Sequence, residues 1–515
     1  MLLEELSEEQ KKAVTQSGNV LLTACPGSGK TRVIVYKLAY VLANRDIGTA
    51  HKRASSRLRS TNDRSVLQVH EDHEDHEDDE NVEIGVWEQS HKMVLALTFT
   101  VRAAEEMSKR LEAMNIDTSR VWAGTIHAFC LKWIFEPYHQ ELPEFKGTAD
   151  KNVKAVMSEQ YFKIADEDFC KELIARLKEK YRINPAESIN LKFDRFGQPL
   201  EKASKFTDIL SEYHKTLKQK NLIDFDLLLF YSYRILLQSK ELTLKLAAMF
   251  ELICVDEYQD TQDLQYAIIS LLVKANPSQT SVFFVGDVDQ AIYKSLGGIA
   301  KTHSEIRGEL GGMPLKALNL SANYRSSQRI IDFYMNFQQQ NIKIKGLGKY
   351  AKEKALVSLN RDIHHADIVP EIVRLIKLSL SKGIPENEIC VLVPQWWLVT
   401  SISKQLMKLL PECHFSSSIT RKTASSIIVN TCMGVKGEEF ETVIAYGLLR
   451  GYVPHWSAII SGDERETSQR LLYVIASRAK LNLHLIAERG RVTNNGKPYE
   501  INQELDEVVF TYDLV

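Results

Sequence analysis

The feature that most constrains this chain is a glycine-rich turn, ACPGSGKT at 24–31, between a short apolar run and an amphipathic run. The apolar run at 20–22 predicts a strand, and the amphipathic run to about residue 42 predicts a helix. Glycines let backbone N–H groups close around phosphate oxygens at the start of such a helix, where the helix dipole favours anions. The pattern therefore predicts a phosphate-binding loop in an α/β domain, although Ala24 stands where the general pattern has a glycine.

Two residues at the end of this turn have the chemistry that a nucleoside triphosphate needs. The ammonium group of Lys30 would neutralise the β- and γ-phosphates, and the hydroxyl of Thr31 would ligate Mg²⁺. An ordinary glycine turn is the alternative interpretation, but the order of strand, turn and helix favours the phosphate loop. We therefore expect ATP and Mg²⁺ as the cofactors of this chain.

The net charge does not exclude a polyanionic partner, although its value first suggests that it does. The formal charge of the 515 residues is −2, which by itself argues against a polyanionic partner. Nine of the acidic residues, however, lie together in 70–83, so the rest of the chain carries +7. A mildly basic body with an acidic segment does not exclude a polyanion.

Cysteine usage and hydropathy exclude other classes of protein. The seven cysteines are scattered, odd in number and without a CxxC pair, which excludes a disulfide scaffold and a thiolate zinc site. No apolar run is long enough for a membrane helix, and the first residues resemble no signal or transit sequence. We expect an intracellular protein with no membrane partner, in the nucleus or cytoplasm, with an organelle left open.

Short apolar runs alternate with helical patterns in two sets. The first set lies at 20–22, 93–99, 252–257 and 281–287, and the second at 318–320, 390–393, 426–431, 442–446 and 483–486. Strands that alternate with helices predict parallel sheets, so two sets predict an α/β fold with two such sheets.

Two segments break this alternation. Residues 45–92 combine a basic, serine-rich stretch with the run HEDHEDHEDDE, and this composition predicts a solvated, disordered insertion. Residues 142–217 are helical and charged and predict a helical inserted subdomain. The remaining chain then forms a first α/β domain at 1–141 and 218–317, and a second at 318–515.

The 45–92 segment allows further interpretations. The histidines among the acids of 70–80 could bind a divalent metal, but a solvated charge run is the favoured interpretation. The basic stretch 51–64 could be a nuclear signal or an arm that contacts DNA.

An acidic pair ends the apolar run at 252–257. The carboxylate of Asp256 could bind Mg²⁺, and the carboxylate of Glu257 could polarise an attacking water. Acids at a strand end usually belong to a solvated turn, but together with the glycine turn they predict a nucleotide site. After the next run, Gln290 could sense the γ-phosphate or position the water.

Arg325 and Arg478 lie far along the chain from Lys30. Phosphoryl transfer spreads charge over equatorial oxygens, so arginines supplied by another domain stabilise its transition state. Taken singly, each arginine is more simply explained as a surface or structural ion pair. The motifs that surround them favour the phosphate role.

The motifs, in this order, resemble those of superfamily 1 helicases of the UvrD/Rep/PcrA type. The matching segments run along the whole chain: LSEEQKKAV (6–14), ACPGSGKT (24–31), LTFTVRAAEEM (97–107), GTIHAFC (124–130), NLIDFDLLL (221–229), VDEYQDT (255–261), VGDVDQAIYKSLGG (285–298), LNLSANYRSS (318–327), TCMGVKGEEF (431–440) and QRLLYVIASRAK (469–480). The resemblance implies two RecA-like P-loop NTPase domains with parallel sheets, plus one helical inserted subdomain.

The resemblance also implies roles for individual residues. Gln10 would contact the adenine, Tyr324 would stack on the base, and Glu439 would lie near the ribose. The other nucleotide-binding residues would be Ala24, Cys25, Pro26, Gly27, Ser28, Gly29, Lys30, Thr31 and Arg32, with Thr31 and Asp256 on the metal. The catalytic residues would be Lys30, Asp256, Glu257, Gln290, Arg325 as the arginine finger, and Arg478 on the γ-phosphate.

Single-stranded DNA would run along a second group of residues, in which this chain departs from the family. The implied contacts are Thr98, Phe99, Thr100, Arg102, His127 and Tyr293. The family has an aromatic residue at the position of Ser295, an arginine at Leu296, an asparagine at Val101, a lysine at Arg102 and a histidine at Met433. Base–aromatic stacking contributes about 1–3 kcal/mol per base, so we expect a weaker hold on DNA.

Two more departures concern the second motor domain. Trp396 and Trp397 follow an apolar run and could offer a substitute stacking surface, but core packing of at least one is favoured because tryptophans are mostly buried. The family has a large helical insertion before TCMGVKGEEF, where this chain has only the polar residues 416–426.

From these features we expect an ATP-dependent single-stranded DNA translocase and 3′-5′ DNA helicase in DNA repair or recombination. Its partners would be single-stranded DNA and junctions of single and double strands, with RNA left open. The protein would be a monomer or a weak dimer. The alternative is a DNA-dependent ATPase, such as an anti-recombinase or regulator, that binds or clears strands without processive unwinding.

Overall fold

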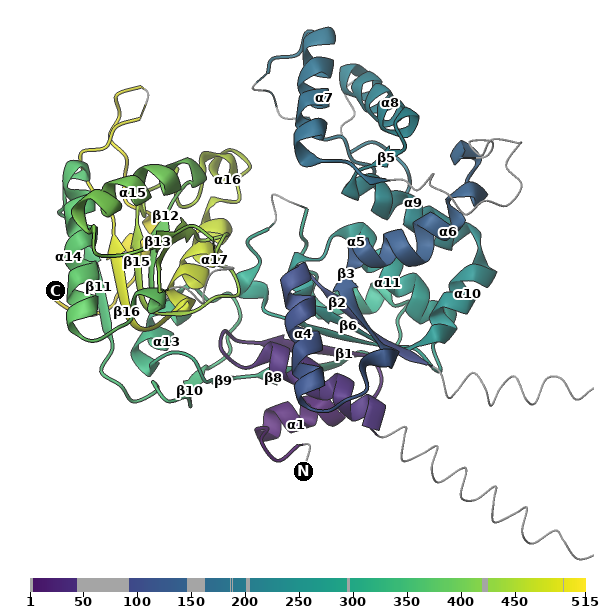
Figure 1. Ribbon diagram of the computed structural model, residues 1–515, viewed down its shortest axis with the longest axis horizontal. Helices are drawn as coiled ribbons and strands as arrows, with labels where there is room; N and C mark the ends of the chain where they lie inside the picture. The colour runs from purple at the N-terminus through teal and green to yellow at the C-terminus, as the bar shows by residue number, and fades with distance from the viewer. Residues whose placement is uncertain are drawn as a thin grey trace, which may run out of the picture. The chain divides into compact units, whose positions relative to one another are not determined.

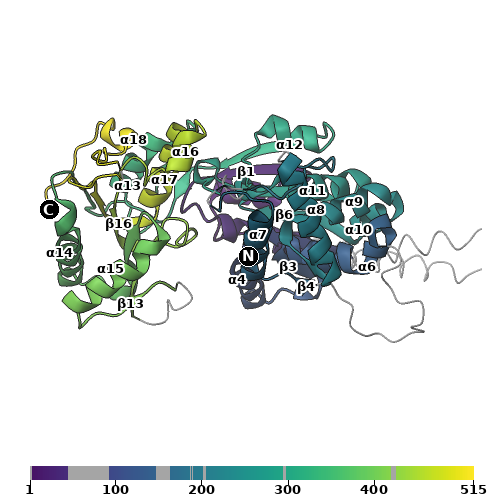
Figure 2. The same cartoon turned by 90° about the horizontal axis from the view of Figure 1, so that it is seen from above.

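The computed structural model describes residues 3–43, 92–145, 163–185, 187, 189–200, 204–293, 297–418, 425–493 and 495–515. The chain divides into two units, and Figures 1 and 2 show their helices and strands. The first unit comprises Met1–Leu22, Thr31–Val285 and Gly297–Leu318, and the second comprises Thr23–Lys30, Gly286–Leu296 and Asn319–Val515. Of the predicted insertion at 45–92, all but Lys92 lies outside the described residues.

The first sheet has six strands in the order β3-β2-β6-β7-β1-β8. Their bounds are Val20–Ala24 (β1), Met93–Thr98 (β2), Val121–Thr125 (β3), Phe250–Asp256 (β6), Ser281–Gly286 (β7) and Lys316–Leu320 (β8). The pairs β2–β3, β2–β6 and β6–β7 are parallel. Nearly every residue of β2, β6 and β7 is buried, because helices cover a parallel sheet on both faces.

The helices beside this sheet are α1 (Glu8–Thr15), a helix at 30–43, α4 (Val101–Ala113), α9 (Phe225–Gln238), α10 (Lys240–Met249) and α11 (Asp263–Ala275). Hydroxyl and carboxylate side chains begin several of them: Thr100 accepts from the backbone of Ala103 at the start of α4, and Asp224 accepts from Leu227 at the start of α9. Such caps satisfy N–H groups that have no partner within the helix. Among the described residues, no helix combines the length and apolar character needed to cross a bilayer.

The second sheet also has six strands, in the order β11-β16-β15-β12-β14-β13. Their bounds are Leu356–Asn360 (β11), Ile389–Val393 (β12), Phe415–Ser416 (β13), Ile427–Thr431 (β14), Phe440–Tyr446 (β15) and Ala479–Ile486 (β16). All five neighbouring pairs are parallel. Cys390 and Leu392 pack in one core cluster while Val391 and Val393 pack in another, which is the two-residue alternation of a sheet covered on both faces.

The predicted α/β fold with two parallel sheets is confirmed, and all the predicted strands are present. Three strands of the two six-stranded sheets were not predicted: β3, β11 and β13. All five residues of β3 are only half-buried, and the apolar run in its sequence VWAGT ends at a glycine after three residues. Strand β13 has only two residues, too few to form a pattern.

The predicted helical segment contains α7 (Glu167–Lys180) and α8 (Ser204–Gln219), which run side by side in Figure 1. Lys180 at the end of α7 forms an ion pair of 2.6 Å with Glu212 of α8, and the hydroxyl of Tyr181 donates to the same carboxylate at 2.8 Å. The short parallel strands β4 (Lys163–Ile164) and β5 (Leu222–Ile223) join the two ends of this segment. Its boundaries at 142 and 217 stay a prediction.

Four charged side chains tie this segment to the first sheet domain. Arg195 donates to both oxygens of Asp263, at 2.7 and 2.5 Å, and to both oxygens of Glu309, at 3.0 and 2.9 Å. Lys301 donates to the same two carboxylates at 2.9 and 2.6 Å. Burial alone would raise the pKa of Asp263 and Glu309, but the hydrogen bonds from Arg195 and Lys301 outweigh burial and lower both pKa values. The network therefore stabilises the charged carboxylates.

We expect Arg195→Ala to lower the free energy of unfolding by about 2 kcal/mol, because it leaves two half-buried carboxylates with one cation between them. Differential scanning calorimetry at pH 7 measures the change. Arg110→Ala is the matched control: its pair with Glu106 is exposed on both sides, so its loss should cost less than about 0.5 kcal/mol. Equal effects of the two variants would contradict the structural role of the network.

The stabilisation by this network should also depend on pH. Carboxyls whose pKa is lowered by folding stabilise the native state at pH values above their unfolded pKa of about 4, and this contribution is lost as pH falls through the folded pKa. The stability difference between the parent and Arg195→Ala should therefore be largest at pH 6–7 and shrink below about pH 4. A difference that stays constant from pH 7 to pH 3 would contradict the lowered pKa values.

Candidate active site

The glycine turn leaves β1 at Ala24 and enters the helix at Lys30. Gly27 and Gly29 have positive φ angles of 67° and 82°. Residues that carry a Cβ atom rarely adopt such angles, whereas glycine adopts them readily. Ser28 is buried and its hydroxyl donates to the carbonyl of Cys25 at 2.7 Å. The turn thus presents backbone N–H groups at a helix start, and Gly27 and Gly29 carry no side chains of their own, which fits a phosphate group.

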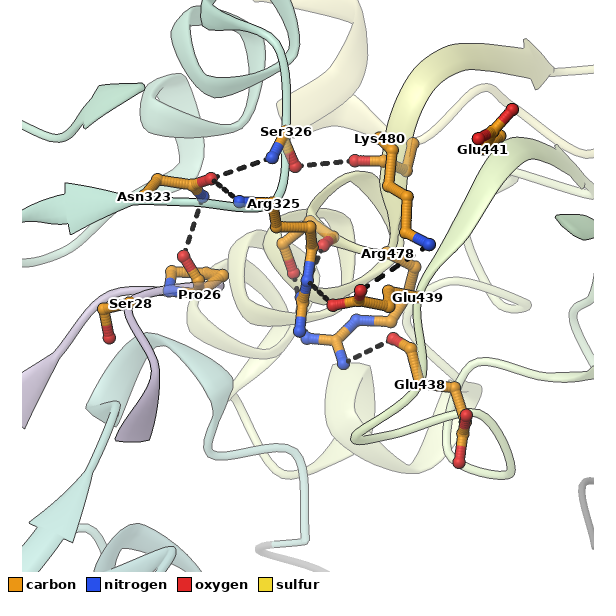
Figure 3. A network of polar contacts seen from close by, with 12 residues as sticks. Pro26, Ser28, Asn323, Arg325, Ser326, Glu438, Glu439, Glu441, Arg478 and Lys480 are labelled. Carbon is orange, nitrogen blue, oxygen red and sulfur yellow. Dashed lines mark hydrogen bonds and ion pairs between the residues drawn. The ribbon is translucent and has the colours of Figure 1, made fainter. Parts of the chain in front are cut away.

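The segment after β8 lies against this turn, as Figure 3 shows. The backbone N–H of Tyr324 donates to the carbonyl of Gly27 at 2.9 Å, and the amide of the fully buried Asn323 donates to the carbonyl of Pro26 at 2.7 Å. A Cβ atom placed on Gly27 would lie 2.5 Å from the Cβ of Arg325. The contact is therefore possible only with glycine at position 27.

Arg325 is oriented by groups on three sides. Its backbone N–H donates to the side-chain oxygen of Asn323 at 2.8 Å. Its guanidinium donates to Glu439 at 2.6 Å and to the carbonyl of Ser477 at 2.9 Å (Figure 3). Glu439 also lies 3.6 Å from the ammonium of Lys480. Arg325 and Glu439, which were predicted at the phosphate and at the ribose, thus form one ion pair.

Arg478 is almost completely buried, with 1% of its surface exposed. Its guanidinium donates to the carbonyls of Val474 and Glu438, both at 3.2 Å, and to the side-chain oxygen of Gln290 at 3.0 Å. Gln290 in turn donates to Asp287 at 2.8 Å. Arg478 and Gln290 are 188 residues apart in the sequence and were predicted to lie in one site. The structure brings them into direct contact.

A second carboxyl lies beside Asp287. Asp289 is buried and accepts a hydrogen bond from the backbone of Gln339 at 2.8 Å. Burial and the charge of Asp287 raise the pKa of Asp289 to about 7. Neither Asp287 nor Asn323 was given a role from the sequence, although Asn323 directly precedes Tyr324 and Asp287 lies three residues before Gln290.

The first unit holds the predicted acids. Asp256 is the last residue of β6, and Glu257 follows with a left-handed backbone, φ 51°. Glutamate adopts this conformation rarely, and such strain is concentrated at functional sites. One oxygen of Asp256 accepts from the backbone of Glu257 at 3.0 Å, and Gln259 donates to the carboxylate of Glu257 at 2.5 Å. The strained backbone and the Gln259 contact fix the direction of Glu257.

Two more predicted nucleotide contacts have structural partners in the first unit. The side chain of Gln10 accepts from the backbone of Ser7 at 3.0 Å and completes the capping box of α1. Arg32 forms an ion pair of 2.8 Å with Glu5. Thr31 lies in the first turn of the helix that follows Lys30 and is half-buried. Among the described residues, no three His, Cys, Asp or Glu side chains are grouped for a metal ion.

The predicted DNA contacts near the carboxyl end of β2 differ in exposure. Phe99 has 44% of its surface exposed, and Arg102 on α4 is exposed as well. Thr98 is buried and donates to the carbonyl of Thr100, whose own hydroxyl caps α4. Phe99, Thr100 and Arg102 are therefore the exposed residues of this group, while the buried Thr98 holds the turn through its hydrogen bond to Thr100.

His127 follows β3, at the start of a helical segment that continues as a π-helix at Cys130–Phe135. Its ring packs edge-on against Phe225 with the centroids 4.8 Å apart, and Phe225 is 52% exposed. Desolvation lowers the pKa of His127 to about 4. His127 is thus neutral at pH 7 and presents an uncharged ring at this position.

Tyr293 lies in the second unit, where its hydroxyl donates to the carbonyl of Met433 at 3.2 Å. The ammonium of Lys436 lies 4.7 Å from the centre of its ring. Ser295 and Leu296, at which the sequence departs from the family, lie outside the described residues.

The favoured interpretation of the tryptophan pair was wrong. Trp396 and Trp397 are each 64% exposed, so neither packs in the core. They begin α15 (Trp396–Leu409), and the apolar positions of that helix which face the sheet are taken by Leu398, Val399, Ile402 and Leu406.

Comparison with known proteins identifies the family. Residues 6–309 match the UvrD/REP helicase N-terminal domain, and residues 398–490 match the UvrD-like helicase C-terminal domain. The chain belongs to the UvrD/REP helicase family. The first match alone covers more than half of the chain and contains the glycine turn, Asp256, Glu257 and Gln290.

Similar proteins include three helicases of bacteria. A probable DNA helicase II homolog of Mycoplasma capricolum is 27% identical over 70% of this chain and 43% of its own length. DNA helicase II of Salmonella typhimurium and ATP-dependent DNA helicase PcrA of Staphylococcus aureus are each 26% identical over 64% of this chain, and 40% and 39% of their own lengths. The UvrD/REP chain described here thus spans about two fifths of the length of these relatives.

A solved structure, the C-terminal domain of a possible DNA helicase from Lactobacillus plantarum, is 20% identical over 36% of this chain and 94% of its own length, with a TM-score of 0.26.

We expect Gly27→Ala to lower the free energy of unfolding by roughly 3 kcal/mol, since it adds left-handed strain and a Cβ clash with Arg325. Gly18→Ala is the matched control, because Gly18 has a similar φ of 75° but nothing within 4 Å of an added Cβ. Strain alone should cost that variant about 1 kcal/mol. Calorimetry measures both, and equal losses would show that residues 322–325 do not lie against the turn.

Proposed function

We propose that this chain is an ATP- and Mg²⁺-dependent motor that translocates on single-stranded DNA and unwinds duplexes with 3′-5′ polarity. The observation that supports this most strongly is the assembly around the glycine turn. Arg325 lies with its Cβ against Gly27, and Arg478 is hydrogen-bonded to Gln290. Membership of the UvrD/REP family and relatives named DNA helicase II and PcrA support the same function. DNA repair or recombination, as the process served, rests on the resemblance alone.

The glycine turn and the two arginines would act on the triphosphate. Backbone N–H groups of residues 27–30 and the ammonium of Lys30 would bind the phosphates, as helix starts bind anions. Arg325 now donates to Glu439 at 2.6 Å. We propose that it exchanges this carboxylate for phosphate oxygens, because a triphosphate carries more negative charge than one glutamate and arginine binds both in the same bidentate manner.

Arg478 would respond to the presence of the same phosphate through its hydrogen bond with Gln290. Both side chains are at least 97% buried and share a direct hydrogen bond of 3.0 Å. A change in what Gln290 contacts must therefore change what Arg478 contacts, since a buried donor left without a partner costs about 1–3 kcal/mol. This pair is our candidate for the group that senses hydrolysis.

Glu257 would hold and polarise the attacking water. Its left-handed backbone and the hydrogen bond from Gln259 fix the carboxylate in one direction, and preorganised groups are those that lower a barrier. Thr31 and Asp256 would hold Mg²⁺, which takes hydroxyl and carboxylate oxygens and, when bound, neutralises charge on the phosphates. Tyr324, which is 38% exposed, would stack on the adenine.

We expect Lys30→Ala and Glu257→Gln each to reduce ATP turnover by at least about 100-fold. Glu257→Gln should keep ATP affinity within about threefold, because it keeps the shape of the side chain and removes only the base. Steady-state phosphate release with and without single-stranded DNA, together with equilibrium binding of a fluorescent ATP analogue, measures the two effects. The exposed Arg110→Ala serves as the control with parental turnover.

A strand-displacement assay beside a translocation assay then tests the finer part of this proposal. Unwinding of duplexes with a 3′ single-stranded tail, but not with a 5′ tail, would support the polarity. DNA-stimulated hydrolysis without displacement of either duplex would contradict helicase activity and support a strand-clearing ATPase. Parental hydrolysis by Lys30→Ala would contradict the catalytic assignment itself.

A further inference from the structure

Four charged side chains of the second unit form one row of ion pairs that begins at Arg325. The guanidinium of Arg325 contacts one carboxylate oxygen of Glu439 at 2.6 Å, and the ammonium of Lys480 lies 3.6 Å from the other oxygen. Lys480 also forms an ion pair of 2.9 Å with Glu388. Figure 3 shows the carboxylate of Glu439 between the two cations. The charges of the row alternate in sign, so Glu439 and Lys480 each have two partners of opposite charge.

The two cations of this row are shielded from water. The side chains of Arg325 and Lys480 each expose only 12% of their surface, and Glu439 is half-buried. Charges interact more strongly when less water surrounds them. Because both cations face the same carboxylate, a closer contact of Lys480 with Glu439 weakens the hold of Glu439 on Arg325.

The backbone segments after Arg325 and Glu439 are both bonded to the segment around Lys480. The N–H of Ser327 donates to the carbonyl of Lys480 at 3.0 Å, and the N–H of Phe440 donates to the carbonyl two residues before Lys480 at 2.9 Å. The main chain that carries the three charges is therefore held in place. A change of partner in the row requires rotation of side chains and no movement of the chain.

The proposed reaction moves Arg325 from Glu439 to the phosphates. This step removes one of the cations that Glu439 contacts, and a half-buried carboxylate that loses a cation opposes the step. Lys480 already faces the second oxygen of the same carboxylate. Its flexible side chain carries three rotatable N–H donors, so it can approach Glu439 as Arg325 leaves. The row can thus compensate the charge that Arg325 gives up.

We propose that Lys480 is a positioning residue for Arg325: it pairs with Glu439 when Arg325 turns to the nucleotide, and so reduces the free-energy cost of that exchange. The proposal rests on the function proposed above and adds a residue that touches neither the nucleotide nor the metal. Glu388 acts in the opposite direction, because it holds Lys480 at 2.9 Å, closer than Glu439 does at 3.6 Å. The row therefore sets how easily Arg325 is released.

The test uses the full chain at saturating single-stranded DNA, and measures kcat and KM for ATP from steady-state phosphate release. Lys480→Met should lower kcat about fivefold, which corresponds to the roughly 1 kcal/mol that a partly exposed ion pair contributes. The KM should stay within about twofold, since an arginine finger acts on the transition state. Lys480→Arg keeps the cation and should restore most of the parental kcat.

Glu388→Gln is the matched control for the loss of an ion pair. It removes the same 2.9 Å pair as Lys480→Met, and it keeps an oxygen that accepts from the backbone of Glu441 at 3.1 Å. Because it releases Lys480 toward Glu439, it should not lower kcat. A mere loss of stability would lower kcat in both variants alike, and that result would overturn the proposal.

A double variant tests whether Lys480 acts through Glu439. In Glu439→Gln the carboxylate that holds Arg325 is absent, so the addition of Lys480→Met should change kcat less than twofold. Equal effects of Lys480→Met with and without Glu439→Gln would overturn the proposal, and so would a parental kcat of Lys480→Met.

Arg325→Ala distinguishes this failure from a failure of the proposed motor. If Arg325→Ala lowers turnover at least about 100-fold while Lys480→Met has no effect, only the role of Lys480 is wrong. Parental turnover of Arg325→Ala, or a parent that does not hydrolyse ATP, would overturn the phosphate role of Arg325 and this inference with it.

Discussion

The structure around the glycine turn depends on a close approach of two backbone segments at Gly27. The N–H of Tyr324 and the amide of Asn323 both donate to carbonyls of the turn, and a side chain at position 27 would leave no room for them. The backbone position of Arg325 is consequently fixed by hydrogen bonds of its two preceding residues, Asn323 and Tyr324, to the turn. Fixing a charged group before the reaction avoids the reorganisation that otherwise adds to the barrier.

One short segment of the second unit contributes residues both to the contacts of the two arginines and to a cavity beside Trp396. Residues 431–440 supply Glu438 and Glu439 to the two arginines and supply Cys432 and Met433 to the cavity beside Trp396. Val435, which is completely buried, holds the middle of this segment in the core. One segment can contribute to both places because the carboxyl ends of all strands in a parallel sheet lie at the same edge.

Most of the framework could be predicted from the sequence, because buried parallel strands are continuous apolar runs and the glycine turn has a strict pattern. Strand β3 could not be predicted, since VWAGT is half-buried and interrupted by glycine. The pairing of Arg478 with Gln290 follows from tertiary structure alone, and so does the left-handed backbone of Glu257. The exposure of Trp396 and Trp397 contradicted the general tendency of tryptophan to be buried.

The join between β13 and β14 has a consequence for the architecture of related chains. Phe415 and Ser416 pair with Ile427 and Ile428 at the outermost position of the second sheet, with 417–426 between them. An edge strand of two residues contributes little to the core. Additional residues can therefore be inserted after it without disturbing the interior strands. This junction is therefore a position at which a further domain can be inserted or removed while the interior strands β12, β14 and β15 stay in place.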